Sequence, residues 1–248
     1  MANYTLHTLA QAPGMIAGFD RLAQQWVPFM NHDTVAGELF GYLYEWFAEY
    51  QLGLLDENDT VIARMLAAPI RWDGHDESLP DRGWDWVLTN AVETYRAGLT
   101  PNAVSAIEIN VTSDLRGQGL SRVGLGHMKA NARRLGFGRL VAPVRPNMKS
   151  HYPLTPMENY IHWQHDDSGA PFDPWLRVHW RDGARIAKVA PQSMVIPGTV
   201  TEWEAWTGMR FPESGTYVVP GALVPVEIDR ENDRGTYTEP NVWIVHTL

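Results

Sequence analysis

The chain has 248 residues, of which 44% are hydrophobic and 20% are charged. This length predicts one enlarged domain, and the composition excludes a disordered chain. The formal net charge of −9 argues against general nucleic-acid binding, and the absence of cysteine excludes disulfides, thiolate metal sites and cysteine nucleophiles. Because the chain has no long apolar run, and residues 1–10 lack the pattern of a secretory signal, we expect no membrane partner and a cytoplasmic location.

Hydrophobic spacing and turn residues predict a series of helices and strands along the chain. Strands and helices alternate only in its middle part, which predicts a mixed α+β or α/β fold. The expected helices are 15–26, 34–50, 84–96, 120–135, 174–182 and 201–207. The expected strands are 51–55 and 61–68, joined as a hairpin, then 106–112, 140–144, 185–190, 217–228 and 242–245.

The clearest predicted strand is 106–112, because polar and apolar residues alternate strictly along it. In a strand, alternate side chains point to opposite faces of the sheet. The alternation therefore predicts one face with Glu108, Asn110 and Thr112 and the other with Ile107, Ile109 and Val111.

Positive charge is concentrated in one segment of this acidic protein. Residues 115–150 contain eight lysine and arginine residues and no acid, so the rest of the chain has 12 cations against 29 acids. Such a segment favours a site for one polyanionic ligand, and a solvated basic helix face is the alternative.

A glycine-containing turn lies between the predicted strand 106–112 and the predicted helix that follows. Its sequence is Arg116-Gly117-Gln118-Gly119-Leu120-Ser121. A glycine turn that opens a helix exposes backbone N–H groups at the positive end of the helix dipole, where phosphate groups bind. The side chains of Arg116 and Arg122 would add charge to such a site.

This segment resembles the acyl-CoA motif of the GNAT acyltransferase superfamily, Arg/Gln-x-x-Gly-x-Gly/Ala. Residues 111–116 resemble the family's lead-in to that motif, with Ser113 in place of a proline, and Ser121 occupies the last motif position. The resemblance implies a GNAT-like, mostly antiparallel twisted sheet flanked by helices and splayed between its fourth and fifth strands. It also implies that acetyl-CoA or another acyl-CoA binds as co-substrate, without a metal. The residues implied to bind CoA are Ile109, Asn110, Val111, Thr112, Arg116, Gly117, Gln118, Gly119, Leu120, Ser121, Arg122 and Asn147.

The same resemblance implies two catalytic residues. His179 stands four residues before Gly183, where the family often has a tyrosine near the thioester sulfur, so it is the predicted general acid for the leaving thiolate. A satisfied interior histidine is the alternative. Glu108 is the predicted general base, acting through one water, and pairing of this carboxylate with a neighbouring strand is the alternative.

Two further histidines, His162 and His165, have the spacing of metal ligands on a helix, and a polar loop explains them equally well. The sequence contains no serine-hydrolase elbow and no zincin motif.

We therefore expect a single domain, 1–248, with a core at about 50–190, insertions at about 69–101 and 148–172, and a C-terminal extension, 191–248. The 11 tryptophans are frequent in these added segments, and we hypothesise that the insertions close over an aromatic acceptor cleft. The expected reaction moves an acyl group, with acetyl as the first expectation, from acyl-CoA to an amine of a small molecule. The alternatives are a GNAT-like enzyme that acts on acyl or peptidyl carrier-protein thioesters, by S-acyl transfer or decarboxylation, and a non-catalytic CoA-binding module. A homodimer is one of the assemblies that the sequence leaves open.

Overall fold

The computed structural model describes residues 4–248 and contains one twisted sheet whose strands run in the order β1-β2-β3-β4-β5-β9-β8-β7, with β6 paired to β9. All pairs are antiparallel except the pair of β4 and β5, which confirms the predicted mixed and mostly antiparallel fold. The strands are β1 (Thr5–Thr8), β2 (Leu52–Leu55), β3 (Val61–Ile70), β4 (Ala103–Val111), β5 (Arg139–Val144), β6 (Arg185–Gly198), β7 (Gly215–Tyr217), β8 (Val226–Asp229) and β9 (Arg234–Thr247). The helices are α1 (Ile16–Ala23), α2 (Thr34–Leu39), α3 (Gly41–Glu45), α4 (Gly83–Arg96), α5 (Leu120–Arg134), α6 (Met157–Tyr160), α7 (Pro174–Arg181) and α8 (Val200–Thr207).

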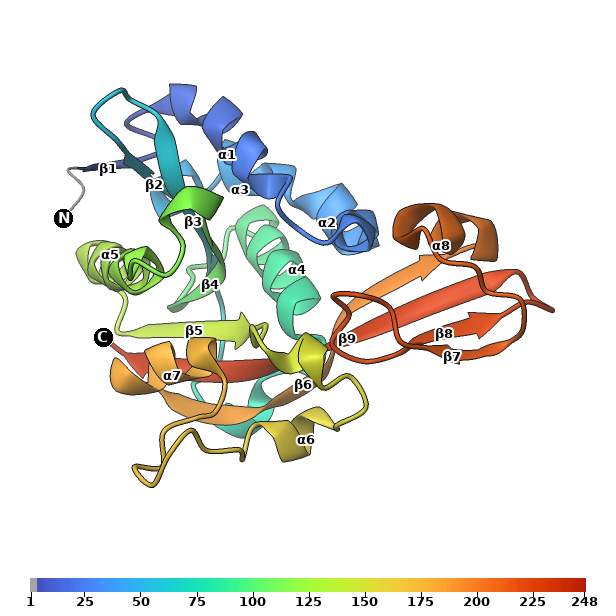
Figure 1. Ribbon diagram of the computed structural model, residues 1–248. Helices are drawn as coiled ribbons and strands as arrows, with labels where there is room; N and C mark the ends of the chain where they lie inside the picture. The colour runs from blue at the N-terminus through green and yellow to red at the C-terminus, as the bar shows by residue number, and fades with distance from the viewer. Residues whose placement is uncertain (1–3) are drawn as a thin grey trace.

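Helices cover both faces of the sheet (Figure 1). α1, α3 and α4 pack over one face, and their apolar residues form a core cluster with one side of β3. α5 and α7 pack over the other face, where they form a second cluster with the opposite side of β3. β3 is buried along all of its ten residues because it has helices on both faces.

The C-terminal residues form part of the sheet as well as an arm. Residues 242–247 of β9 pair with β5, and most of the strand pairs with β6, so residues 242–245 lie between two strands of the central sheet. The first part of β9 leaves the central sheet together with β6, β7, β8 and α8, and these elements form the arm seen at the right of Figure 1. The arm has its own apolar cluster, in which Trp203 is fully buried against Phe29.

Most predicted elements are present, and the differences have local causes. The segment predicted as one helix, 34–50, is divided into α2, α3 and a 3-10 turn, Ala48–Tyr50. The segment predicted as one strand, 217–228, is interrupted at Pro220-Gly221, and Gly221 has a positive φ of 85°. Strands β6 and β9 are much longer than predicted because they pair with each other. β1, which was not predicted, adds to β2 as an edge strand.

Candidate active site

β4 and β5 separate soon after they begin to pair. Only Val104 and Ser105 of β4 pair with β5, opposite Leu140 and Val141. A bulge in the pairing of β4 with β3 accompanies the separation, because Leu66 faces Glu108 whereas Ala67 faces Ala106. Ile107 is the extra residue. The predicted splay between these strands is therefore present.

The bulge also corrects the predicted faces of β4. Ile107 packs in the cluster beneath α4, whereas Val111 packs in the cluster beneath α5, so the two side chains do not share a face. The extra residue at the bulge shifts the alternation by one position. The carbonyl of Ile107 is held from the α4 side by the indole N–H of Trp84, at 3.2 Å.

A cavity of about 490 Å³ opens between the separated strands. We call it the central cavity. Its walls include residues 106–109 of β4 and 142–145 at the end of β5, and it reaches Ser121 at the start of α5. On the opposite side it is bounded by the N-terminal helices and by the first turn of α4. It therefore connects the two faces of the sheet at the splay, and it has the volume of a small-molecule site.

The predicted glycine turn, residues 116–121, lies at the α5 end of the cavity. Gly117 and Gly119 have positive φ angles of 77° and 83°, a conformation that a side chain disfavours. Gly119 is the N-cap of α5 and gives no side-chain hydrogen bond to the helix. The N–H of Arg122 bonds to the carbonyl of Gly119 at 3.0 Å, whereas the N–H groups before it in this 15-residue helix have no intrahelical partner and lie at the positive end of its dipole.

The eight cations of residues 115–150 do not form one surface. Five have partners away from the glycine turn, and Arg116 itself contacts Gln25 and the carbonyl of Val111. The five are Lys129 with Asp182, Arg134 with Glu49, Arg139 with the carbonyl of Gly74, Arg145 with Glu239, and Lys149 with two carbonyl groups. Local positive charge at the turn thus comes from Arg116, Arg122 and the helix N-terminus.

Glu108 lines the cavity and forms a buried ion pair with Arg64 of β3. The Nε and Nη2 atoms of Arg64 donate to the two carboxylate oxygens, each at 2.7 Å. Arg64 also donates to the carbonyl of Phe19 in α1 and to the hydroxyl of Tyr44 in α3. Burial raises the pKa of Tyr44 to about 12, so its hydroxyl stays protonated. The pair joins β3 and β4 to the helices that cover them.

His179 lines the cavity from α7 and is 1% exposed. Its Nδ1 lies 2.9 Å from Nε2 of His246 on β9, and its Nε2 has no hydrogen-bond partner within residues 4–248. Burial lowers the pKa of His179 to about 3, with smaller contributions from His246 and Lys129. The imidazole is therefore neutral at physiological pH.

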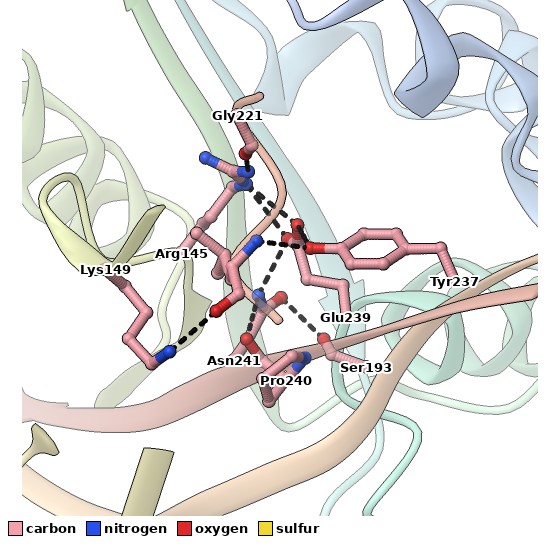
Figure 2. Close-up of polar contacts among 9 residues, drawn as sticks. Arg145, Lys149, Ser193, Gly221, Tyr237, Glu239, Pro240 and Asn241 are labelled. Atoms are coloured by element: carbon pink, nitrogen blue, oxygen red, sulfur yellow. Dashed lines mark hydrogen bonds and ion pairs between the residues drawn. The ribbon is translucent and has the colours of Figure 1, made fainter. Parts of the chain in front are cut away.

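The wall formed by β6 and β9 is polar and fully hydrogen-bonded around Glu239 (Figure 2). Glu239 is 0% exposed and accepts from Nε of Arg145, the hydroxyl of Tyr237 and Nδ2 of Asn241. Asn241 in turn accepts from the hydroxyl of Ser193 on β6. Arg145, Glu239 and Asn241 line the cavity. We call these five residues the polar wall.

Aromatic rings form the side of the cavity that faces away from the glycine turn. They are contributed by the N-terminal helices and by the start of α4, and they are Trp26, Phe40, Tyr44 and Trp84. Asp20 of α1 also lies on this side. In the described part of the chain, Asp20 has no hydrogen bond or ion pair, unlike Glu108 and Glu239, which are paired with arginines. The aromatic residues of 148–172 instead pack on one another, as in the contacts of Tyr160 with Trp163 and Phe172.

No family model matches the chain. A curated relative does: the arginine N-acetyltransferase avaD of Aspergillus versicolor is 34% identical over 275 residues, covering 99% of this chain and 94% of the relative. The chain belongs to the GNAT acyltransferase superfamily. The predicted reaction class, acyl-CoA-dependent acyl transfer to an amine, is confirmed by this match.

Two solved structures show the same fold as this GNAT enzyme over nearly its whole length. The loading GNATL domain of CurA from Lyngbya majuscula has a TM-score of 0.66 at 20% identity, covering 99% of this chain and 98% of that domain. The GphF GNAT-like decarboxylase, solved in complex with isobutyryl-CoA, has a TM-score of 0.58 at 19% identity, covering 99% of this chain and 98% of that one.

The splay of this GNAT enzyme brings together some of the predicted site residues and separates others. Those that line the central cavity are Glu108, Ile109, Ser121, Asn147 and His179. Asn110 does not line it, because its amide donates to the carbonyl of Leu22 in α1 at 2.8 Å, and Val111 and Leu120 are core residues. Thr112, Arg116, Gly117, Gln118, Gly119 and Arg122 lie on the adjoining turn. The assigned roles of all these residues stay predictions.

Several cavity residues of this GNAT enzyme were not predicted from the sequence. Arg64 carries a detectable signal, since it is a lone charge within an apolar strand, Val61-Ile62-Ala63-Arg64-Met65-Leu66. Asp20, Glu239 and Asn241 carry none, because each depends on which strands and helices become neighbours.

Two features of residues 4–248 bear on other ligands. No helix there is long and apolar enough to cross a membrane. No group of three or more histidine, aspartate or glutamate side chains there is placed to hold a metal ion, so His162 and His165 have no third ligand among them.

Proposed function

We propose that this GNAT enzyme transfers an acyl group from acyl-CoA to a nitrogen of a cationic small molecule of the arginine type. The observation that carries the proposal is the central cavity, which joins the glycine turn on one face of the sheet to an aromatic pocket with an unpaired carboxylate on the other. Because acyl-CoA is an intracellular metabolite, we also propose that the enzyme acts in the cytoplasm.

The glycine turn would hold the CoA pyrophosphate through the N–H groups that open α5, assisted by Arg116 and Arg122. The pantetheine arm would lie in the gap between β4 and β5, since these strands do not pair beyond Ser105. Backbone N–H groups of the bulged β4 would polarise the thioester carbonyl.

The acceptor pocket favours a cation for two reasons. The charged residues on the cavity wall are three carboxylates and two guanidinium groups, and the two buried ion pairs leave Asp20 as the excess charge. The faces of Trp26, Phe40, Tyr44 and Trp84 add aromatic surface, which attracts ammonium and guanidinium groups. The name of the curated relative, an arginine N-acetyltransferase, supports an acceptor of this class.

The proposed reaction can be followed with acetyl-CoA and a small panel of acceptors. The release of CoA thiol and the mass of the product are measured. The panel contains arginine, agmatine, lysine and the neutral amide acetamide, together with a phosphopantetheinyl carrier protein. We expect turnover with at least one guanidinium or ammonium compound and none with acetamide. Acyl transfer to the carrier alone would overturn the small-molecule acceptor.

Asp20→Asn tests the acceptor pocket, with Glu38→Gln on the exposed surface of α2 as the matched control. We expect the Asp20 variant to raise KM for a cationic acceptor about 10-fold, a loss typical of one charge-assisted contact, while KM for acetyl-CoA stays unchanged. An unchanged acceptor KM, or the same increase in the control, would show that Asp20 does not bind the acceptor.

A further inference from the structure

A row of side chains leads from the central cavity past two buried histidines to the partly exposed carboxylate of Asp182. It begins at His179, whose Nδ1 lies 2.9 Å from Nε2 of His246. The Nδ1 of His246 lies 3.8 Å from Oδ2 of Asp182, which immediately follows α7. That same oxygen accepts from Nζ of Lys129 on α5 at 2.6 Å. The row thus joins elements far apart in sequence, α7, β9 and α5.

The row favours one arrangement of hydrogen on the ring nitrogens. A carboxylate oxygen of Asp182 lies 3.8 Å from Nδ1 of His246, beyond hydrogen-bond distance, and its negative charge favours hydrogen on this nitrogen of the neutral ring. Its Nε2 is then a lone pair and accepts from Nδ1–H of His179. The remaining nitrogen of His179, Nε2, therefore has a lone pair and no hydrogen. It is the atom that is buried without a partner among the described residues, on a side chain that lines the cavity.

We propose that His246 and Asp182 are positioning residues that hold His179 with the Nε2 lone pair available to the reacting groups. His179 then acts first as a base and only afterwards as an acid, which revises the role predicted for it. The inference rests on the proposed function, because it needs an acceptor nitrogen and a thioester in the cavity.

A protonated acceptor nitrogen first gives one proton to water, which frees its lone pair, and the steps that follow need no group besides His179. The neutral acceptor nitrogen attacks the thioester carbonyl carbon, the C–N bond forms, and the nitrogen becomes acidic. Its proton passes to Nε2 of His179, the C–S bond breaks with its electron pair on sulfur, and Nε2–H returns the proton to the CoA thiolate. While His179 is protonated, Nδ1–H stays hydrogen-bonded to His246, and Asp182 is the nearest carboxylate to that ring.

Burial of this row also costs free energy, which a histidine pair with a purely structural role would not need to cost. Two imidazole rings are buried here, next to a carboxylate that is 28% exposed, and one nitrogen of each ring lacks a hydrogen-bond partner in the described structure. Apolar residues of equal volume would remove these unpaired atoms. A row that begins at the cavity and fixes a tautomer accounts for all three side chains.

Histidine ¹⁵N shifts of the wild-type protein test the tautomers directly and do not depend on activity. In protein labelled with ¹⁵N-histidine at pH 7, we expect both rings to be neutral and to carry hydrogen on Nδ1. Hydrogen on Nε2 of His179 would overturn the proposal, because that nitrogen would then donate and not accept.

Kinetics of His246 variants test the role in turnover, with acetyl-CoA and the best acceptor of the panel. His246→Phe keeps a ring but removes both nitrogens, and we expect kcat to fall about 10- to 100-fold with KM for acetyl-CoA unchanged. His246→Gln, which keeps one hydrogen-bonding group, should recover part of that loss. His127→Gln is the matched control, since His127 is another histidine with an unpartnered Nε2 but lies outside the cavity lining.

The outcomes separate the inference from the proposed function. If wild-type protein releases no CoA with any acceptor, the proposed function fails. If wild-type protein turns over and folded His246→Phe does so at the same kcat, His246 does not position a catalytic group and the inference fails. An equal loss in the His127 control would also overturn it, because the effect would then be unspecific.

Discussion

At the scale of single residues, the ion pair between Glu108 and Arg64 has consequences for both stability and catalysis. Both oxygens of Glu108 already accept from the guanidinium group, and the side chains of Arg64 and Glu108 are 2% and 6% exposed. A buried charge that loses its partner is strongly destabilising, whereas replacement of a whole pair by apolar residues often is not. Substitutions can therefore separate a structural role of Glu108 from the predicted role as general base.

We expect Glu108→Gln to lower the free energy of unfolding by about 3 kcal/mol, because Arg64 stays buried without its counter-charge. The double variant Arg64→Met with Glu108→Leu should regain most of this loss. Urea unfolding measures both. With the folded fraction held constant, we expect kcat of Glu108→Gln to fall less than about 10-fold, since a general base is worth about 100-fold or more. A larger loss in kcat would support the predicted base.

At the scale of secondary-structure elements, the N-terminus of α5 depends on a residue without a side chain. Gly119 has a φ of 83°, and a Cβ atom there would meet no other atom within 4 Å. The need for glycine is therefore a matter of backbone conformation and not of space. The same turn presents the N–H groups that we assign to the CoA pyrophosphate.

Gly119→Ala should raise the dissociation constant for acetyl-CoA about 10-fold. A side chain disfavours the positive φ at this position, so the turn no longer directs its N–H groups toward one phosphate. Gly126→Ala, at an open position in the middle of the same helix, is the control. It should leave binding unchanged and stabilise α5 by up to about 1 kcal/mol. Isothermal titration calorimetry and thermal unfolding distinguish the two results, and equal affinity in both variants would contradict the assignment of the turn.

Helices α2 and α4 meet through two buried carboxyl groups. Asp33 caps α2 by accepting from the N–H of Ala36 at 2.7 Å, and Asp85 lies in the first turn of α4. The residues are 2% and 3% exposed, and each has one oxygen without a donor among the described residues. Burial, followed by the charge of Asp33, raises the pKa of Asp85 to about 8. A proton shared by the two carboxyls therefore supports this contact at neutral pH.

The sign of the pH dependence follows from this proton. The folded protein holds it up to about pH 8, whereas an unfolded aspartate loses it near pH 3.8, so the folded state binds more protons in between. The contribution of Asp85 to stability should thus decline as pH rises from about 4 to 8. Asp85→Asn should remove this decline, and its stability relative to wild type should rise by up to about 1.4 kcal/mol per pH unit in this window. Urea unfolding at pH 5, 6.5 and 8 measures this difference in stability, and Glu77→Gln, at an exposed position, is the control. Parallel curves of stability against pH for wild type and Asp85→Asn would contradict the shared proton.

At the scale of the whole molecule, β9 connects the central sheet to the arm. Its end lies between β5 and β6, and its beginning pairs with β6 and β8 beyond the edge of the central sheet. Three residues of the polar wall, Tyr237, Glu239 and Asn241, lie on β9, and His246 lies near the end of the strand. One strand thus contributes to the polar wall of the cavity and to the residues behind His179.

A chain ending at residue 190 should therefore fail to fold, even though it contains the whole core predicted from the sequence. It would leave β5 and the rest of β6 without their shared neighbour, β9. It would also expose the apolar residues that residues 242–245 cover in the full chain. Circular dichroism and amide-proton dispersion of the truncated protein test this. Native-like spectra would show that residues 191–248 are an extension outside the folding unit.

Trp203 anchors the arm, and its removal should weaken the arm without reaching the glycine turn. The ring is fully buried against Phe29, and it packs so closely on Gly235 that a Cβ atom there would lie 2.2 Å from it. We expect Trp203→Ala to lower the free energy of unfolding by about 3–5 kcal/mol through the cavity it leaves. Affinity for acetyl-CoA should remain that of wild type. Chemical unfolding and calorimetry measure both quantities, and an equal loss of CoA affinity would contradict an independent arm.

The elements of the proposed donor side could largely be predicted from the sequence, whereas those of the proposed acceptor side could not. The strand, the glycine turn and α5 follow one another in the chain, and their conformation depends on local φ angles and a helix N-terminus, which residue types reveal. The cap of α7 is local in the same way, because Asp173 directly precedes Pro174 and accepts from the N–H groups of Trp175 and Leu176. The bulge at Ile107 was missed because it arises from pairing with β3, and alternation alone gives no sign of it.

The sequence by itself determined the family motif, the glycine turn before α5 and the mixed fold, because each depends on residues close together in the chain. Only the tertiary structure decided which charges are paired and what surrounds His179. Arg64 and Glu108 are 44 residues apart, His179 and His246 are 67 apart, and Arg145 and Glu239 are 94 apart. Such contacts arise from the order in which strands pair and from burial that makes an unpaired charge costly, and neither is written in any short segment of the chain.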